Sequence, residues 1–521
     1  MVLPLLSILA VLPIIGAIAL FPLRTRDNRV FGFWVSLVTL AVAVACVVIN
    51  RSTDLSEQVA WIRPLGAWYA MSLDGLSSVM VLVTCVLTTC VLGVGVPAAV
   101  PSQPEQTVGD ADPGRPLPSG VFTPLVLGLQ GLALFTFMAS DLIMFTLVFE
   151  ATLIPAFFLI GGWGSIQRGA AAVKFLLFGL AGGFLLLAGA IALGLQSATI
   201  GRPSMLFSQL AELDIPAATA RPLFIVLFLA FALKAPLVPL HGWLPSVVEH
   251  TSPQVAVLLV GILDAVGPYG MIRLCLGVMG DEAKWASPVL LIVALVSVIY
   301  GALAALSERH LTRLVALTSV GHSGLIVFGI FAMSPVALTG AILYIFAHSL
   351  SAAALLLCAA FVAERTGTLA IGEFGGLARK APVLAGLFLF AGLATLSLPG
   401  TANFAGEFSV IVGAFASHPW QAAVAIFATL LAAAYVLVAY QRVFTGPLRA
   451  EHANVVDVIP VQKWAVGVLI ALLLAVGVFP RPLVQLADEA STFVMTQIGV
   501  AAPDVVVPDG AAGADDAEED R

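Results

Sequence analysis

Residues 224–245 read FIVLFLAFALKAPLVPLHGWLP, a largely apolar stretch that carries one lysine and three prolines. About 20 mostly apolar residues cross the hydrocarbon core of a bilayer as a helix, so this stretch is long enough to span a membrane. Lys234 lies near its middle. The prolines follow it, at Pro236, Pro239 and Pro245. Because proline removes a backbone donor and clashes with the preceding turn, the stretch predicts a membrane helix that is broken beside a charged side chain.

The composition of the whole chain agrees with that prediction. Of 521 residues, 60% are hydrophobic and 10% are charged, whereas soluble domains average about 45–50% apolar and about 25% charged residues. The 23 Lys and Arg residues are too few to solvate a globular surface of this size. A soluble enzyme, a nucleic-acid-binding protein and a disordered chain are therefore excluded. We predict an all-α polytopic membrane protein that contacts lipid.

About fourteen stretches have the length and apolarity of a membrane-spanning helix. No Lys or Arg precedes Arg24, so the first stretch lacks the basic start of a signal peptide and is expected to be a membrane helix. The stretches lie at roughly 2–23, 29–50, 75–98, 120–138, 142–162, 170–195, 221–250, 252–277, 286–306, 311–333, 336–362, 382–415, 421–444 and 463–485.

A second apolar stretch carries a similar interruption. Residues 386–408 read GLFLFAGLATLSLPGTANFAGEF, with Pro399 and Gly400 in the middle. Unwound backbone at membrane depth is tolerated only where it is buried or lines a wet cavity, so both breaks are candidate functional sites. Because the broken stretches lie five spans apart, we expect two inverted repeats of five helices each. Packing kinks are the alternative explanation of the prolines.

The chain is therefore expected to have five parts. Residues 1–119 would form helices 1–3, and residues 120–277 the first five-helix repeat. Residues 278–444 would form the second repeat, and residues 445–501 a C-terminal helix 14. Residues 502–521 hold seven acidic residues and one arginine, which predicts a disordered acidic tail.

The distribution of Lys and Arg predicts the orientation of the chain. Numbered from the N-terminus, the odd loops hold 14 of these residues and the even loops hold 6. Cytoplasmic loops carry the excess of positive charge, so the odd loops should face the cytoplasm. Both termini are then expected on the outer side of the membrane.

Two opposite charges are expected deep in the membrane, where one ionisable side chain costs at least about 2.5–3.5 kcal/mol and indicates a functional site. At 1.5 Å per residue, Glu150 lies roughly 13 Å and Lys234 roughly 20 Å into their spans. The two side chains are expected to pair. Bringing Glu150 closer would favour protonation of Lys234, and separating them would release that proton. A static ion pair between helices is the alternative.

Other titratable side chains could extend a proton path. Glu407 follows the second break and is a second candidate proton carrier. His322 and His348 lie in the middle of spans, where imidazole can pass protons through water chains. Solvation at a span end is the alternative for Glu407, and a hydrogen-bonded structural role is the alternative for each histidine.

Three more candidates lie close to these spans. Asp264 lies inside the stretch 252–277, and packing does not explain it. His241 follows the first break. Lys174 opens the stretch 170–195, where it would be either an anchor at the membrane interface or a further relay residue.

The sequence holds no pattern typical of a bound cofactor. Metal sites and iron–sulfur clusters need closely spaced ligands, and the cysteines lack C-x-x-C spacing. No Gly-rich phosphate loop or dinucleotide fingerprint is present. We therefore expect no metal or cofactor in this chain. The five cysteines, expected to be small core residues, are Cys46, Cys85, Cys90, Cys275 and Cys358.

A set of longer motifs carries a family resemblance. Between about residues 140 and 410 the chain reads DLIMFTLVFEATLIPAFFLIGGWG, LKAPLVPLHGWLP, IYGALAAL, ALTSVGHSGL, AHSLSAAALLL, FGGLARKAP and LSLPGTANFAGEF. In this set the chain resembles the antiporter-like membrane subunits of respiratory complex I, the proton-pumping NADH–quinone oxidoreductase. It is most similar to the bacterial M-type subunit, because of its length, its EATLIP motif and the acid at Glu407, where related subunits usually carry lysine.

The resemblance implies a function. The chain would translocate protons as a subunit of an NADH:quinone oxidoreductase in the bacterial plasma membrane, driven by quinone reduction in other subunits. NADH, flavin, iron–sulfur clusters and quinone would be bound by those subunits, and this chain would hold no redox centre. Its partners would be the L-, N-, K-, J-, A- and H-type subunits. Glu150, Lys234 and Glu407 would carry protons, with His322 and His348 between them.

One position departs from the family pattern. The family usually reads ILLKLGGYG in the eighth span, whereas residues 262–270 read ILDAVGPYG. Ala265 stands where the resemblance implies a central relay lysine, and Asp264 is its neighbour. Either Asp264 or water bound to the histidines would then carry the middle of the path, or the path differs.

Two other functions are weighed against this one. A multisubunit cation/proton antiporter or a membrane-bound hydrogenase complex contains subunits with the same motifs. A structural membrane subunit with vestigial charges is the third reading.

Overall fold

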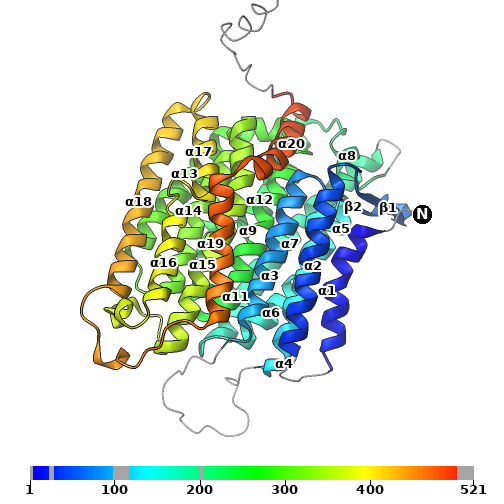
Figure 1. The fold of residues 1–521 in the computed structure, drawn as a ribbon. Helices are drawn as coiled ribbons and strands as arrows, with labels where there is room; N and C mark the ends of the chain where they lie inside the picture. The colour runs from blue at the N-terminus through cyan, green and yellow to red at the C-terminus, as the bar shows by residue number, and fades with distance from the viewer. Residues whose placement is uncertain (1–3, 23–27, 98–116, 200–202, 501–521) are drawn as a thin grey trace, which may run out of the picture.

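The computed structural model describes residues 4–22, 28–97, 117–199 and 203–500. In this part of the chain the helices form one bundle, in which most long axes run side by side (Figure 1). Among the described residues, twelve helical segments are long and apolar enough to cross a membrane, and three shorter apolar helices accompany them. The predicted all-α polytopic fold is confirmed. The expected acidic tail, 502–521, lies outside the described residues.

The first half of the chain runs from α1 to the turns of the eighth span. Its helices and strands are α1 (Leu5–Leu20), α2 (Asn28–Asn50), β1 (Ser56–Ile62), η1 (Arg63–Leu65), β2 (Ala67–Ser72), α3 (Gly75–Val94), α4 (Ser119–Met138), α5 (Leu142–Ala151), α6 (Leu153–Gly162), α7 (Arg168–Thr199), α8 (Phe207–Leu210), α9 (Ala217–Lys234), η2 (Leu240–Gly242), α10 (Trp243–His250), α11 (Pro253–Leu258), η3 (Leu259–Leu263), α12 (Val266–Gly270) and η4 (Met271–Leu276).

The second half of the chain runs from α13 to α20. Its elements are α13 (Gly280–Ser307), α14 (Leu311–Phe331), α15 (Pro335–Thr366), η5 (Ile371–Glu373), η6 (Leu377–Arg379), α16 (Pro382–Thr395), α17 (Ala402–Phe415), α18 (Pro419–Phe444), η7 (Ala450–His452), α19 (Pro460–Val478) and α20 (Arg481–Gln497). Each of the fourteen predicted stretches has a helix, or a run of two to four helical segments, in the described part of the chain.

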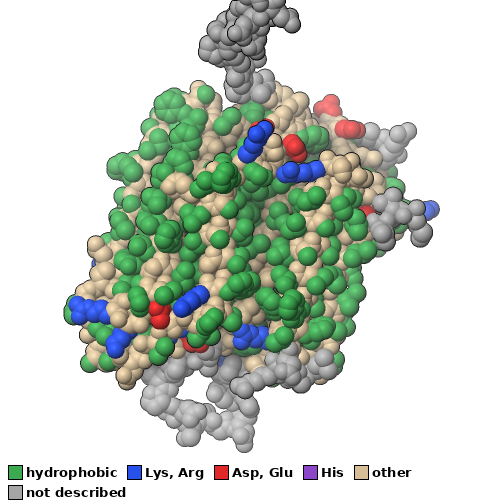
Figure 2. All heavy atoms as spheres, viewed as in Figure 1, with side chains coloured by type: hydrophobic (Ala, Val, Ile, Leu, Met, Phe, Trp, Pro, Cys, Tyr) green, Lys and Arg blue, Asp and Glu red, His purple; other side chains and the backbone are tan. Residues whose placement is uncertain are grey.

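The surface of the bundle has the distribution expected for a protein surrounded by lipid. Figure 2 shows hydrophobic side chains across the middle of the visible face, and Lys, Arg, Asp and Glu side chains near its two ends. Outer helices expose large apolar residues, among them Phe184 of α7 and Phe427 of α18. Since lipid tails solvate such side chains, this apolar surface is consistent with a multi-pass membrane protein.

Two spans lie in the centre of the bundle and carry candidate residues. The segment Pro253–Leu276 contains Asp264, and the segment Pro335–Thr366 contains His348. The most hydrophobic part of each is buried entirely by protein. These two spans therefore place ionisable groups where neither lipid nor bulk water reaches them.

The two described ends of the chain lie at the same face of the bundle. In the hairpin β1–β2, Glu57 accepts a hydrogen bond from the backbone N–H of Leu6, at the start of α1 (2.7 Å). Helix α20 packs against α3, with Leu486 beside Gly75. A chain that crosses the membrane an even number of times ends on the side where it began, which agrees with this arrangement. Which face is the outer one stays a prediction.

The structure adds two elements that the hydropathy pattern does not predict. One is the antiparallel hairpin β1–β2. The other is α20: the predicted stretch 463–485 is interrupted, because α19 ends at Val478 and α20 begins at Arg481, on either side of Pro480. Proline at the start of a helix is favoured, which separates α20 from α19. The division into two inverted repeats, 120–277 and 278–444, stays a prediction.

Candidate functional site

The first break lies directly after Lys234. Helix α9 ends there, and α10 begins only at Trp243. Polar groups at the break find hydrogen-bond partners inside the protein. The backbone N–H of Val238 donates to Ser297 Oγ of α13 (3.0 Å). The indole N–H of Trp243 donates to the Leu233 carbonyl (2.8 Å). Buried hydrogen bonds of this kind are what unwound backbone needs at membrane depth. The predicted break is confirmed.

Lys234 and Glu150 lie together. Lys234 Nζ is 4.0 Å from Glu150 Oε1, the limit of an ion pair, and 4.5 Å from the centroid of the Phe149 ring. The lysine side chain is 9% exposed and the glutamate side chain 24%. Glu150 Oε1 has no hydrogen-bond partner among the described residues. The two charges attract one another without a direct hydrogen bond, which leaves them free to move closer together or apart.

The second break surrounds a polar turn. Helix α16 ends at Thr395 and α17 begins at Ala402. Within the turn Ser397 has a φ of 58°, in the left-handed region, and its hydroxyl donates to Glu407 Oε2 (2.6 Å). Non-glycine residues rarely adopt this conformation, and those that do are often held at functional sites. The break therefore supplies a hydrogen-bond donor to the partly buried carboxylate of Glu407.

The two predicted histidines lie side by side in the core. The ring centroids of His322, in α14, and His348, in α15, are 4.8 Å apart. Nδ1 of His322 is 2.6 Å from the hydroxyl oxygen of Tyr344, and this hydroxyl donates to Glu407 Oε2 (3.2 Å). A continuous set of contacts therefore joins His348, His322, Tyr344 and Glu407.

A cavity of about 20 Å³ adjoins this set of residues. About 10–15 Å³ is enough to hold one water molecule when polar groups line the space. The cavity lies among helices α13, α14, α15, α17 and α18. Its polar lining residues are Thr318, His322, Tyr344, Glu407, Thr429 and Tyr435.

Asp264 occupies the span between the two halves. It follows the π-helical turn η3, and its side chain is buried, with neither carboxylate oxygen bonded to a described residue. The segment η3 packs against α15, which carries His348, and α12 packs against α9, which carries Lys234. A π-turn contains an extra residue and is frequent at functional sites. Asp264 thus lies where one flanking segment packs against α15 and the next packs against α9, whereas Ala265 offers no titratable group.

His241 and Lys174 lie outside these contacts. His241, in η2, packs against Tyr300 with ring centroids 4.6 Å apart, and its Nδ1 has no hydrogen-bond partner in the described part of the chain. Lys174, in the first turns of α7, is half-buried and forms no ion pair with a described residue. The structure brings neither residue to the Lys234–Glu150 pair or to the histidines.

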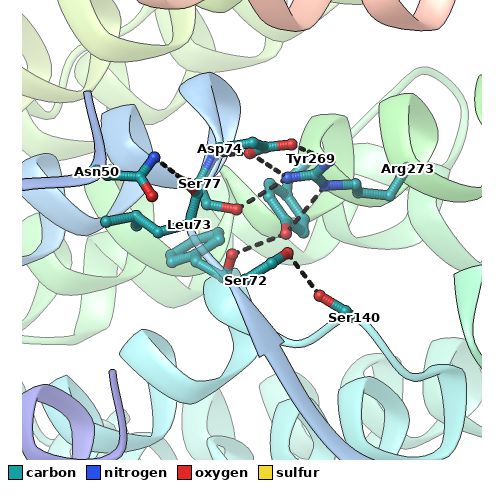
Figure 3. A network of polar contacts seen from close by, with 9 residues as sticks. Asn50, Ser72, Leu73, Asp74, Ser77, Ser140, Tyr269 and Arg273 are labelled. Carbon is teal, nitrogen blue, oxygen red and sulfur yellow. Dashed lines mark hydrogen bonds and ion pairs between the residues drawn. The ribbon is translucent and has the colours of Figure 1, made fainter. Parts of the chain in front are cut away.

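A second polar network holds the C-terminal end of the eighth span, where Arg273 lies (Figure 3). The guanidinium of Arg273, in η4, binds both carboxylate oxygens of Asp74 and donates to Ser77 Oγ (2.8 Å). Its Nε also donates to the hydroxyl of Tyr269 (3.1 Å), which in turn donates to the Phe137 carbonyl (2.8 Å). This fork-like pairing fastens the eighth span to α3 and α4.

Sequence reasoning missed three of these residues: Tyr344, Arg273 and Ser397. For Tyr344 a signal was present, since it stands four residues before His348 and so shares a face of one helix with it. Arg273 lies inside the stretch 252–277, where sequence reasoning did not single it out; its side chain is 16% exposed and pairs with Asp74. Nothing in the local sequence indicates that Ser397 contacts Glu407.

The family model described as "NADH:quinone oxidoreductase/Mrp antiporter, TM" matches residues 139–432, more than half of the chain. The chain belongs to this family. A curated relative, NADH-quinone oxidoreductase subunit M of Mycobacterium tuberculosis, is 36% identical over 98% of each chain. The subunit M of Rhodobacter capsulatus is 30% identical over 91% of this chain and 93% of that one. The resemblance to the M-type subunit of complex I is confirmed.

Solved structures of this family have the same fold. A chain of respiratory complex I from Thermus thermophilus superposes with a TM-score of 0.84 at 28% identity, over 95% of this chain and all of that chain. A chain of the Mrp complex from Dietzia sp. has a TM-score of 0.82 at 22% identity, over 96% of this chain and all of that chain. The second likeness shows a shared fold alone.

Proposed function

We propose that this chain conducts protons in the membrane arm of a bacterial NADH–quinone oxidoreductase. The observation that supports this most is the line of buried titratable groups beside two broken helices, from Glu150 and Lys234 through Asp264 to His322, His348 and Glu407. Each buried charge is costly in a membrane, and such residues typically mark proton paths. The names of the curated relatives and of the complex I structure support the assignment to this enzyme.

The proposed path uses each group in turn. Closer approach of Glu150 would favour the charged form of Lys234, and separation would favour release of its proton toward Asp264. Asp264 or water would pass the proton to the histidines, and Glu407 would be the last carrier in this chain. Because the two groups titrate as a unit, a small change in the Lys234–Glu150 distance would strongly change how readily Lys234 gives up its proton.

The energy would come from quinone reduction in other subunits. This chain would hold no redox centre, and it would assemble with L-, N-, K-, J-, A- and H-type subunits in the bacterial plasma membrane, with both termini outside. Lys174 and His241 would help protons enter or leave at the membrane surfaces and would not belong to the central proton path.

The test uses the assembled complex in membrane vesicles. We expect Lys234→Ala and Glu150→Ala each to lower NADH:quinone turnover and coupled proton uptake by about tenfold, which corresponds to about 1.4 kcal/mol in the barrier. The amount of assembled complex should stay normal. Lys284→Ala is the matched control, since Lys284 pairs with Asp281 at the exposed start of α13. Normal pumping in both test variants would instead indicate a structural subunit.

The same vesicles distinguish the antiporter reading. Without an electron donor, a cation/proton antiporter would exchange an imposed sodium gradient for protons, and the proposed subunit would not. Sodium-driven exchange that is abolished by Lys234→Ala would overturn the assignment to the oxidoreductase.

A further inference from the structure

The hydroxyl of Tyr344 lies between two groups of the proposed path. Its oxygen is 2.6 Å from His322 Nδ1 and 3.2 Å from Glu407 Oε2. The tyrosine side chain is fully buried, so bulk water does not compete for these contacts. The three residues come from α14, α15 and α17, and no hydrogen bond joins His322 directly to Glu407 in the described part of the chain.

We propose that Tyr344 is a proton-transfer residue that connects His322 to Glu407. The inference rests on the proposed function and assigns the chemistry of one step in it. Both distances are in the range from which a proton passes directly between donor and acceptor, about 2.6–3.2 Å. Tyrosine suits this position because its hydroxyl is both a donor and an acceptor.

The step conserves atoms and charge. In the starting state His322 is an imidazolium that donates from Nδ1 to the tyrosine oxygen, and the tyrosine hydroxyl donates to the Glu407 carboxylate. The Nδ1–H bond of His322 breaks as a new O–H bond forms on Tyr344. The original O–H bond of Tyr344 breaks as Glu407 Oε2 gains the proton. The products are neutral His322, neutral Tyr344 and a protonated Glu407, and no oxidant or reductant takes part.

The remaining contacts fit a directional step. Nε2 of His322 and Nδ1 of His348 have no hydrogen-bond partner among the described residues, so the imidazole side of the step is open to a proton from His348 or from water. Glu407 Oε2 also accepts from Ser397, which keeps the carboxylate turned toward the tyrosine. The cavity beside Tyr344 and Glu407 can hold the water that takes the proton onward.

A second tyrosine in the same cavity provides the control. Tyr435, in α18, also lines the cavity and is buried, but its hydroxyl forms no hydrogen bond within the described ranges. Tyr344→Phe and Tyr435→Phe each remove one oxygen from one cavity wall and keep the ring. A general effect of cavity polarity would be of similar size in both variants, whereas a proton-transfer role of Tyr344 predicts a much larger loss in the first.

The experiment measures coupled proton uptake and NADH:quinone turnover of the complete complex in vesicles. We expect about a tenfold loss for Tyr344→Phe, with normal assembly and an unchanged unfolding temperature, and a much smaller loss for Tyr435→Phe, which removes a polar group from the cavity but no contact to His322 or Glu407. The double variant His322→Gln/Tyr344→Phe should be no slower than the slower single variant, because groups that serve one step are not additive. Normal pumping in Tyr344→Phe, equal losses in both tyrosine variants, or additive losses in the double variant would overturn the proposal.

Two further measurements separate failure of this proposal from failure of the proposed function and cover a variant that does not assemble. Lys234→Ala is measured in parallel: normal pumping there contradicts the proposed function itself, whereas normal pumping only in Tyr344→Phe contradicts the role of Tyr344 alone. If Tyr344→Phe does not assemble, 3-fluorotyrosine at position 344 keeps both packing and hydroxyl but makes the hydroxyl more acidic. A proton-transfer role then predicts altered turnover, and turnover equal to that of the unmodified complex would overturn it.

Discussion

Lys234 Nζ lies 4.0 Å from Glu150 Oε1, with the ring of Phe149 on another side of the ammonium group, 4.5 Å from the nitrogen. The pair is close enough for strong coupling in a poorly solvated setting, yet it lacks the hydrogen bond of a tight ion pair. Phe149 and Glu150 are neighbours on α5, so a small rotation of this helix changes both contacts of the lysine. The distance between the two charged groups can therefore change more easily than it could in a tightly hydrogen-bonded ion pair.

Gly183 provides a way to disturb this pair without removing a charge. In α7 its Cα faces the Glu150 carboxylate so closely that an added methyl group would overlap the carboxylate atoms. Gly183→Ala should therefore push Glu150 aside and lower coupled turnover by about tenfold. Gly169→Ala in the same helix is the control, because no heavy atom lies within 4 Å of an added Cβ there. Equal turnover in the two variants would show that the position of Glu150 does not matter.

Asp264 can be tested with two substitutions of different chemistry. Asp264→Asn keeps the shape and removes the titratable group, so we expect coupled proton uptake to fall severalfold in assembled complex. Asp264→Leu also removes the buried polar oxygens, which have no partner, and should leave the unfolding temperature unchanged or raise it. Loss of pumping without loss of stability would identify a proton carrier. Full pumping in Asp264→Asn would indicate that the histidines and water, not Asp264, carry the proton through the middle of the path.

The Arg273–Asp74 pair should contribute to stability. Arg273→Met leaves the Asp74 carboxylate without its bidentate partner and is expected to lower the free energy of unfolding by about 1–3 kcal/mol, measured by thermal unfolding of purified complex. The double variant with Asp74→Asn should recover part of this loss, since no unpaired charge remains. Lys284→Met breaks an exposed pair with Asp281 and should cost at most about 0.5 kcal/mol. A similar effect of Arg273→Met and Lys284→Met would contradict the structural role of the network.

His310 should make stability depend on pH. It lies outside the spans, between α13 and α14, where burial lowers its pKa below the ordinary value of 6.5 despite the nearby Glu249 and Glu308. The unfolded chain then takes up a proton at a higher pH than the folded chain does. Stability from this group is complete above about pH 6.5 and is lost as pH falls toward the folded-state pKa. As the pH is lowered from about 7.5 to about 5.5, roughly one unit on either side of the ordinary histidine value, the unfolding temperature should fall less in His310→Asn than in the unchanged chain. Equal changes in unfolding temperature with pH in the variant and the unchanged chain would contradict the prediction.

The local sequence predicted most of the fold. Hydropathy and proline positions are local properties, so the spans and the mid-membrane charges could be predicted along the chain, and the two broken helices from 224–245 and 386–408. The expected proximity of Glu150 and Lys234 also followed, because opposite charges on separate spans have few other partners in lipid. The hairpin β1–β2 and helix α20 were not expected, since short polar segments outside the spans leave no strong hydropathy signal.

The sequence by itself determined that this chain crosses a membrane many times, that two of its helices break beside ionisable residues, and that its motifs are those of one family. Only the tertiary structure decided which groups touch: that Tyr344 bridges His322 and Glu407, that Arg273 fastens the eighth span to Asp74, and that a π-turn precedes Asp264. The physical reason is range. Hydropathy and backbone breaks depend on neighbours along the chain, whereas a proton passes only between atoms about 3 Å apart, and packing of distant helices sets that distance.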